Sequence, residues 1–114
     1  MKKIILSLLL VLTLIGCSKK ELSITTTIVS DNKNVVIIIE DTIYIKENTK
    51  VIDVAKNISS TDGSKQKYSG VANDFKPKKS ETFNDFEYLM VVAENKKVKK
   101  YYKIVIDREN IYFD

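Results

Sequence analysis

The stretch that decides the fold is FEYLMVVA at residues 86–93, followed by ENKK at 94–97 and VKKYYKIVI at 98–106. Two runs of β-branched and aromatic residues around a short polar break are typical of a β-hairpin. In the second run, large apolar residues alternate from Tyr102 to Ile106, the period of a strand with one buried face. We therefore expect one shared core face, made of Leu89, Val91, Ala93, Tyr102, Ile104 and Ile106.

Shorter runs of the same kind precede this hairpin. Their spacing, with turn residues between them, predicts an all-β sandwich or barrel. The Glu40-Asp41 break predicts a tight antiparallel reversal between its two flanking strands. Apolar spacing of three, four and seven predicts a brief helical turn over Val51–Ile58. The expected strands before the hairpin are Ile24–Val29, Val35–Ile39, Thr42–Lys46 and a weak one near Lys67-Tyr68.

Three segments in order carry a resemblance to a known family. They are TIYI with NTKVIDV at residues 42–54, SGVANDF at 69–75, and LMVVAEN with YKIVI at 89–106. Together they are similar to the bacterial immunoglobulin-like, or cadherin-like, domain of surface lipoproteins. The resemblance implies a single immunoglobulin-like antiparallel β-sandwich over residues 24–108, with 109–114 as a C-terminal tail. The chain departs from the family pattern in its first and last turns and in a charged insertion, Lys76–Asp85.

The first residues read as a targeting segment. Two lysines precede an almost wholly aliphatic run at residues 4–15, which ends in Leu14-Ile15-Gly16-Cys17. A basic start, a short apolar run and a small residue at the cut are the parts of a signal peptide. The last four residues resemble the lipobox of bacterial lipoproteins. The resemblance implies cleavage between Gly16 and Cys17, a lipid on the Cys17 sulfur, and residues 17–23 as a lipidated tether.

The alternative for residues 1–16 is an uncleaved membrane helix. Twelve apolar residues at about 1.5 Å each reach only ~18 Å, and the hydrocarbon core of a bilayer is roughly 30 Å thick. A cleaved signal peptide therefore fits the length better, and it also accounts for the Gly16-Cys17 pair. We expect an extracytoplasmic protein of the cell membrane or envelope, held to the membrane through Cys17.

Composition excludes several classes of function. The chain has no histidine and no tryptophan, and its one cysteine is assigned to the lipid. Histidine-based metal sites and serine–histidine or cysteine–histidine nucleophiles are therefore absent. The carboxylates are scattered through polar stretches, with no pair in an apolar setting that would shift a pKa. We expect a protein that is not an enzyme, with no catalytic residue, cofactor or metal site, and with no internal disulfide.

The charge is mildly basic and resides mainly in lysine, with one arginine, Arg108. Loss of Lys2 and Lys3 with the signal peptide lowers the formal net charge of +4 by two. A nucleic-acid partner is not expected at this balance. The lysine runs at residues 76–79 and 96–103 are interpreted as solvated surface, with contact to anionic lipids or polymers as the alternative.

Two groups of residues have both a structural and a functional interpretation. Asp74 is expected to accept backbone amides at a bend, with calcium binding as the alternative, and Phe75 to fill one end of the sandwich. Four aromatic residues could pack in the core or at edges, or could form a platform for a glycan. These four are Tyr68, Phe83, Phe86 and Tyr88.

Two hypotheses of function follow from the sequence. The first is a monomeric, lipid-anchored surface module that binds, spaces or displays, with an envelope protein or a glycan as partner. The second is a small lipoprotein inhibitor or immunity factor that blocks a secreted enzyme through the loop Lys76–Asp85. The first rests on fold-level analogy and the second on one candidate loop.

Overall fold

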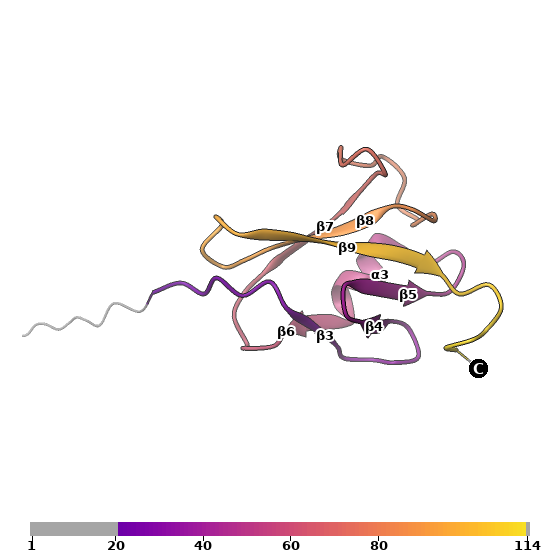
Figure 1. Ribbon diagram of the computed structural model, residues 1–114, viewed down its shortest axis with the longest axis horizontal. Helices are drawn as coiled ribbons and strands as arrows, with labels where there is room; N and C mark the ends of the chain where they lie inside the picture. Colours follow the sequence, from indigo (N-terminus) through magenta and orange to yellow (C-terminus); the bar gives the residue numbers. More distant parts are fainter. Residues whose placement is uncertain (1–20, 114) are drawn as a thin grey trace, which may run out of the picture.

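The structure is a computed structural model that describes residues 21–113 (Figure 1). The signal peptide at 1–16, its cleavage point at Gly16 and the lipid site at Cys17 lie outside the described residues. The described chain is mostly β, with two sheets and one short helix, as the sequence predicts. Its elements are β3 (Ile28–Ser30), β4 (Ile37–Ile39), β5 (Thr42–Ile45), α3 (Val51–Lys56), β6 (Ile58–Ser60), β7 (Lys67–Val71), β8 (Tyr88–Val92) and β9 (Lys99–Ile106).

One sheet has five strands in the order β4-β5-β9-β8-β7, and the other pairs β3 with β6. The core contains residues from both sheets and from α3, so the two sheets enclose one apolar interior. Val54 on α3 and Ile58 at the start of β6 are buried members of this core. The largest fully buried side chains are Tyr102, Phe83, Ile43, Ile45, Leu89, Ile104, Val36, Val54 and Val91.

The closing hairpin forms as predicted. β8 pairs antiparallel with β9, and Leu89 lies opposite Tyr102. The six residues expected on the core face are all at most 8% exposed, whereas Lys103 between them is exposed. The Tyr102 hydroxyl donates to the carbonyl oxygen of Thr26 at 2.9 Å, which satisfies the one polar atom of that buried ring.

The expectation of a wholly antiparallel sandwich is wrong at one strand pair. β4 and β5 form the predicted antiparallel reversal, with Glu40 at positive φ in the turn. β5 then pairs parallel with β9, with Ile43 opposite Ile104. Between these two strands the chain crosses to the second sheet through α3 and β6. Parallel neighbours need such a crossover, because a tight turn can join only antiparallel strands.

The first predicted strand is shorter than expected. β3 begins at Ile28, so the predicted ladder over residues 24–27 does not form. Two carbonyl groups of this segment accept side-chain donors, Gln66 to Thr25 at 2.9 Å and Tyr102 to Thr26. The Thr27 carbonyl accepts the backbone N–H of Thr61 at 3.1 Å. The segment is held by the side chains of Gln66, just before β7, and Tyr102 on β9. Such contacts leave no periodic signal in the sequence.

The C-terminal residues fold back onto the domain rather than extend from it. The Asp107 carboxylate accepts the backbone N–H groups of Ile111, Tyr112 and Phe113 at 2.8–3.1 Å. Desolvation acts to raise the pKa of Asp107, but these three N–H donors outweigh it and lower that pKa. Phe113 is buried, and the Tyr112 ring lies 4.2 Å from the ring of Tyr44.

Candidate functional site: an aromatic cluster and an anchored loop

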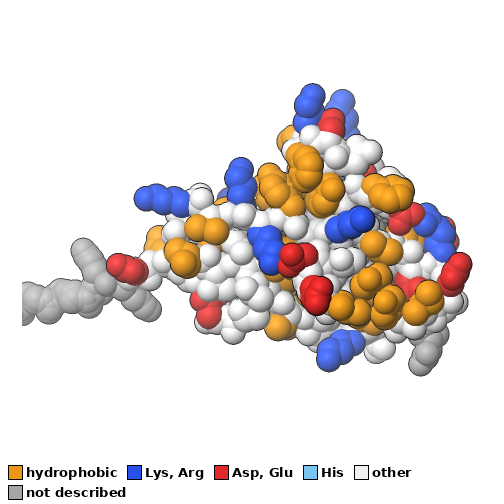
Figure 2. All heavy atoms as spheres, in the orientation of Figure 1, with side chains coloured by type: hydrophobic (Ala, Val, Ile, Leu, Met, Phe, Trp, Pro, Cys, Tyr) orange, Lys and Arg blue, Asp and Glu red, His pale blue; other side chains and the backbone are white. Residues whose placement is uncertain are grey.

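The outer face of the five-stranded sheet carries large side chains near its centre. The register of β7, β8 and β9 places Ser69, Met90 and Tyr101 in one row across the three strands. The next row holds Val71, Tyr88 and Lys103. Hydrophobic side chains gather over this part of the molecule, with lysines around them (Figure 2). The outer face of this sheet is therefore mixed: apolar and aromatic side chains lie beside lysines, and Tyr88 and Tyr101 are partly exposed there.

Phe75 joins this outer face and forms an aromatic cluster with Tyr88 and Tyr101. Its ring stacks on Tyr88 with a centroid separation of 4.6 Å and an interplanar angle of 22°. It also meets Tyr101 edge-on at 5.0 Å. Phe75 remains 50% exposed, so the expectation that it fills one end of the sandwich is wrong. Its φ of +67° places it in a region that bulky residues rarely adopt.

A tight turn holds Phe75 in this position. The Ala72 N–H donates to the Lys76 carbonyl at 2.8 Å, and the Phe75 N–H donates to the Ala72 carbonyl at 2.9 Å. The Asp74 carboxylate accepts the Lys76 N–H at 3.1 Å, which is the backbone role predicted for it. The turn folds the chain back so that Pro77 pairs with Val71, and the Phe75 ring therefore lies over the outer face of the sheet rather than in the interior.

The four aromatic residues named from the sequence do not form one platform. Phe83 is in the core, 1% exposed, and Tyr68 packs against the core while donating to Gln66 at 2.6 Å. Phe86 is 66% exposed and takes no part in the aromatic contacts of the described chain. Only Tyr88 belongs to the cluster. The sequence did carry a signal for Tyr101, since it alternates with the buried Tyr102.

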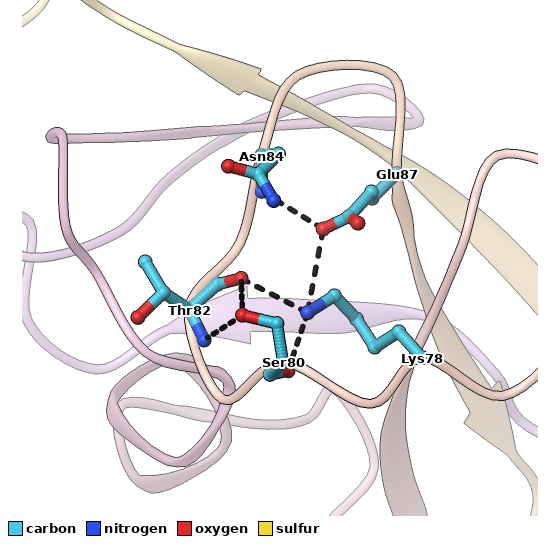
Figure 3. Close-up of polar contacts among 5 residues, drawn as sticks. All are labelled: Lys78, Ser80, Thr82, Asn84 and Glu87. Atoms are coloured by element: carbon cyan, nitrogen blue, oxygen red, sulfur yellow. Dashed lines mark hydrogen bonds and ion pairs between the residues drawn. The ribbon is translucent and has the colours of Figure 1, made fainter.

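The segment from Lys76 to Asp85 is a loop, as predicted, but Lys78 within it is not solvated. Its side chain is 4% exposed and its ammonium donates to the carbonyl oxygens of Ser80 and Thr82. Glu87 lies 3.5 Å from the same nitrogen and also accepts the Asn84 N–H at 2.8 Å (Figure 3). The loop is thus closed around one buried cation. The interpretation of this lysine run as solvated surface is wrong at Lys78.

Gly70 gives the Lys78 side chain room to pass. A Cβ atom at this position would lie 2.8 Å from Lys78 Cδ and 2.9 Å from Val51 Cγ2. Glycine therefore lets the lysine stem run between β7 and α3. Beside this crossing lies an open groove of about 570 Å³, whose apolar lining includes Val51, Ile52, Ala55 and Tyr68.

The carboxylates whose pKa is shifted lie outside the aromatic cluster and accept hydrogen bonds. The hydroxyls of Ser23, Ser60 and Ser64 hold the pKa of Asp62 well below its usual range. The Arg108 guanidinium, together with the N–H of Ile106, lowers the pKa of Asp85. A general acid at neutral pH needs a raised carboxyl pKa. Asp62, Asp85 and Asp107 are all shifted in the opposite direction.

Comparison with models of known protein families, with curated protein sequences and with solved structures finds no match for this chain. Within residues 21–113, no cluster of three or more acidic, histidine or cysteine side chains is placed to hold a metal ion. The same residues contain no helix long and apolar enough to cross a membrane.

Proposed function

We propose that this chain is a lipid-anchored, non-enzymatic protein of the cell envelope, whose immunoglobulin-like sandwich binds or displays at the membrane surface. The observation that carries the proposal is the sequence Leu14-Ile15-Gly16-Cys17 after a basic start and a short apolar run. One structural feature supports it: Ser23, six positions after Cys17, is hydrogen-bonded to Glu94 and Asp62, so the folded part of the chain lies close to the proposed lipid site.

Blocking the lipid site tests the anchor. Cells that express the Cys17→Ser variant should accumulate the unprocessed precursor, because serine offers no thiol to accept the lipid. Incorporation of a radiolabelled fatty acid should fall to background. Equal labelling of the two forms would contradict lipid attachment at Cys17.

The aromatic cluster is the proposed binding surface of the module. Exposed aromatic rings pack against the apolar faces of sugar rings, and Phe75 is held with half of its surface free. Immobilised envelope polysaccharides should retain the protein, and Phe75→Ala should weaken its affinity about fivefold if stacking contributes ~1 kcal/mol. Phe86→Ala is a matched control, since Phe86 is also exposed and at positive φ but lies outside the cluster. Equal loss in both variants would remove the cluster as the binding surface.

The second candidate function is inhibition of a secreted enzyme through the loop Lys76–Asp85. The specific observation in its favour is the Lys78 anchor, which fixes the loop before any partner binds. A preformed loop loses less conformational entropy on binding. Capture of one enzyme at a one-to-one ratio, lost in a Lys79→Ala or Glu81→Ala variant, would favour inhibition. Retention on polysaccharide without such an enzyme would favour the surface module.

A further inference from the structure

The described chain begins at the same end of the domain as the β8–β9 turn (Figure 1). Three hydrogen bonds hold it there. The Ser23 N–H donates to Glu94 at 3.1 Å, its carbonyl accepts the Asn95 N–H at 3.1 Å, and its hydroxyl donates to Asp62 at 2.6 Å. The point at which the tether joins the domain is therefore fixed at one end of the sandwich.

This end carries charges of both signs: Glu21, Asp62 and Glu94 lie around Ser23, and four lysines nearby have no ion-pair partner among the described residues. Lys96 and Lys97 lie in the turn, Lys99 begins β9, and Lys67 shares a row with Lys99 across β8. All four are exposed, and none takes part in an ion pair within the part of the chain that the structure describes. We call these four lysines the basic tip. Lys100 is not part of it, because its ammonium pairs with Asp41 at 2.7 Å.

Exposed apolar side chains accompany the basic tip. Leu22 is 57% exposed and Ile24 66% exposed, on either side of the anchored Ser23. Val98 lies between two residues of the basic tip and is 38% exposed. Apolar side chains that project among lysines fit the boundary between lipid headgroups and acyl chains. Figure 2 shows basic side chains at this end of the molecule, with acidic side chains beside them.

We propose that the basic tip docks on the anionic surface of the membrane that holds the lipid. This inference rests on the proposed lipid anchor at Cys17. Ser23 is six positions after Cys17, and a fully extended chain over that distance spans at most about 22 Å. The tip is therefore held close to the headgroups. Lysines near an anionic surface are attracted to it at short range, within about a Debye length of 8–10 Å.

Docking in this way fixes the orientation of the domain. β9 runs from Lys99 in the basic tip to Ile106 at the opposite end. The aromatic cluster lies further along the sheet, where Tyr88 is opposite Lys103. A domain held by its tip turns the cluster and the loop around Lys78 away from the bilayer. The membrane contact and the proposed binding surface are thus separate parts of the same sheet.

Amine footprinting of the full lipidated chain on vesicles tests this proposal. The chain is reconstituted on neutral phosphatidylcholine vesicles and on vesicles that contain about 30% phosphatidylglycerol. Acetylation of Lys96, Lys97 and Lys99 should be about fivefold slower on the anionic vesicles. Lys46 and Lys79 are exposed elsewhere on the domain and should react equally on both. Roughly 0.5 M salt should remove the protection.

Two variants of equal charge separate local docking from general attraction. Replacing the three lysines at 96, 97 and 99 by glutamine should abolish the protection of Lys67, which remains as a reporter at the tip. Replacing Lys46, Lys76 and Lys79 by glutamine should preserve it. Equal effects of the two variants would overturn the proposal.

Flotation of the vesicles distinguishes the two ways in which this experiment can fail. If the chain does not float with either vesicle, the lipid anchor itself is absent and the proposed function fails with it. If the chain floats with both and the tip lysines react equally, the anchor stands and tip docking is refuted. If a soluble acidic polysaccharide protects the tip on neutral vesicles as strongly as anionic lipid does, the tip is a polymer site and the membrane proposal is overturned.

Discussion

Replacement of Lys78 by methionine should unfold the loop between β7 and β8 and destabilise the whole domain. Methionine preserves much of the aliphatic stem but removes the ammonium group. The Lys78 side chain, including this group, is only 4% exposed. Two carbonyl oxygens, those of Ser80 and Thr82, then lose a charged donor, and Glu87 loses the cation 3.5 Å away. Hydrogen bonds to charged groups contribute about 1.5–3 kcal/mol each, and removal of one partner from a buried pair costs about 3–5 kcal/mol.

These costs overlap, because the freed carbonyls lie in a loop that can open to water. We therefore expect the free energy of unfolding to fall by about 2–4 kcal/mol. Urea unfolding of the segment from residue 18 onwards, followed by circular dichroism, measures this change. Lys79→Met is the matched control, since Lys79 is exposed and adjacent, and it should change stability by no more than ~0.5 kcal/mol.

A double-mutant cycle with Glu87→Gln assigns the part of the cost that comes from the ion pair. Glu87 is 14% exposed in its side chain, so the pair is only slightly screened by water. A coupling energy of about 1 kcal/mol or more is expected for this pair. If Lys78→Met proves no more costly than Lys79→Met, Lys78 does not anchor the loop and the argument is refuted.

Two further predictions concern the core and the effect of pH. Ile104→Ala removes a fully buried side chain where β5 and β9 pair in parallel, and it should lower the free energy of unfolding by about 2–5 kcal/mol. Lys103→Ala should lower it by no more than ~0.5 kcal/mol. A larger loss of stability for Lys103→Ala in urea melts would show that the register is slipped by one residue. Asp62, Asp85 and Asp107 have lowered folded-state pKa values, so their contribution is complete above the unfolded value of about 3.8 and is lost as pH falls below it. The melting temperature should therefore depend little on these three groups between pH 5 and 8 and decline below about pH 4; a decline centred near pH 6 would contradict this assignment.

The hairpin could be predicted from sequence because its signal is local. The alternation over Tyr102–Ile106 predicts both the strand and its buried face. A slip of one residue would turn Tyr102, Ile104 and Ile106 towards solvent. The short helix at Val51 was predictable for the same reason. The parallel pairing of β5 with β9 was not, because Thr42 and Lys103 meet only after the chain has crossed between the sheets.

The candidate site was predictable only in part, because its members come from separate turns. Tyr88 was named from the sequence, but Phe75 was expected to fill one end of the sandwich because the segment 69–75 resembles the family pattern. The positive φ at Phe75 depends on the turn around Asp74, and no residue pattern encoded it. Lys78 was missed for a related reason. Because Lys78 stands among other lysines, the sequence predicts an exposed side chain. Only the positions of Thr82 and Glu87 around its ammonium show that the cation is buried.

The N-terminal residue of the mature protein tests the central claim most directly. Intact mass measurement and peptide mapping of the protein purified from native membranes report where the chain begins and what its first residue carries. The account predicts a chain that lacks residues 1–16 and starts at Cys17, with the mass of a diacylglycerol on the sulfur. A chain that retains Met1, or one that starts elsewhere with Cys17 as a free thiol, would contradict it.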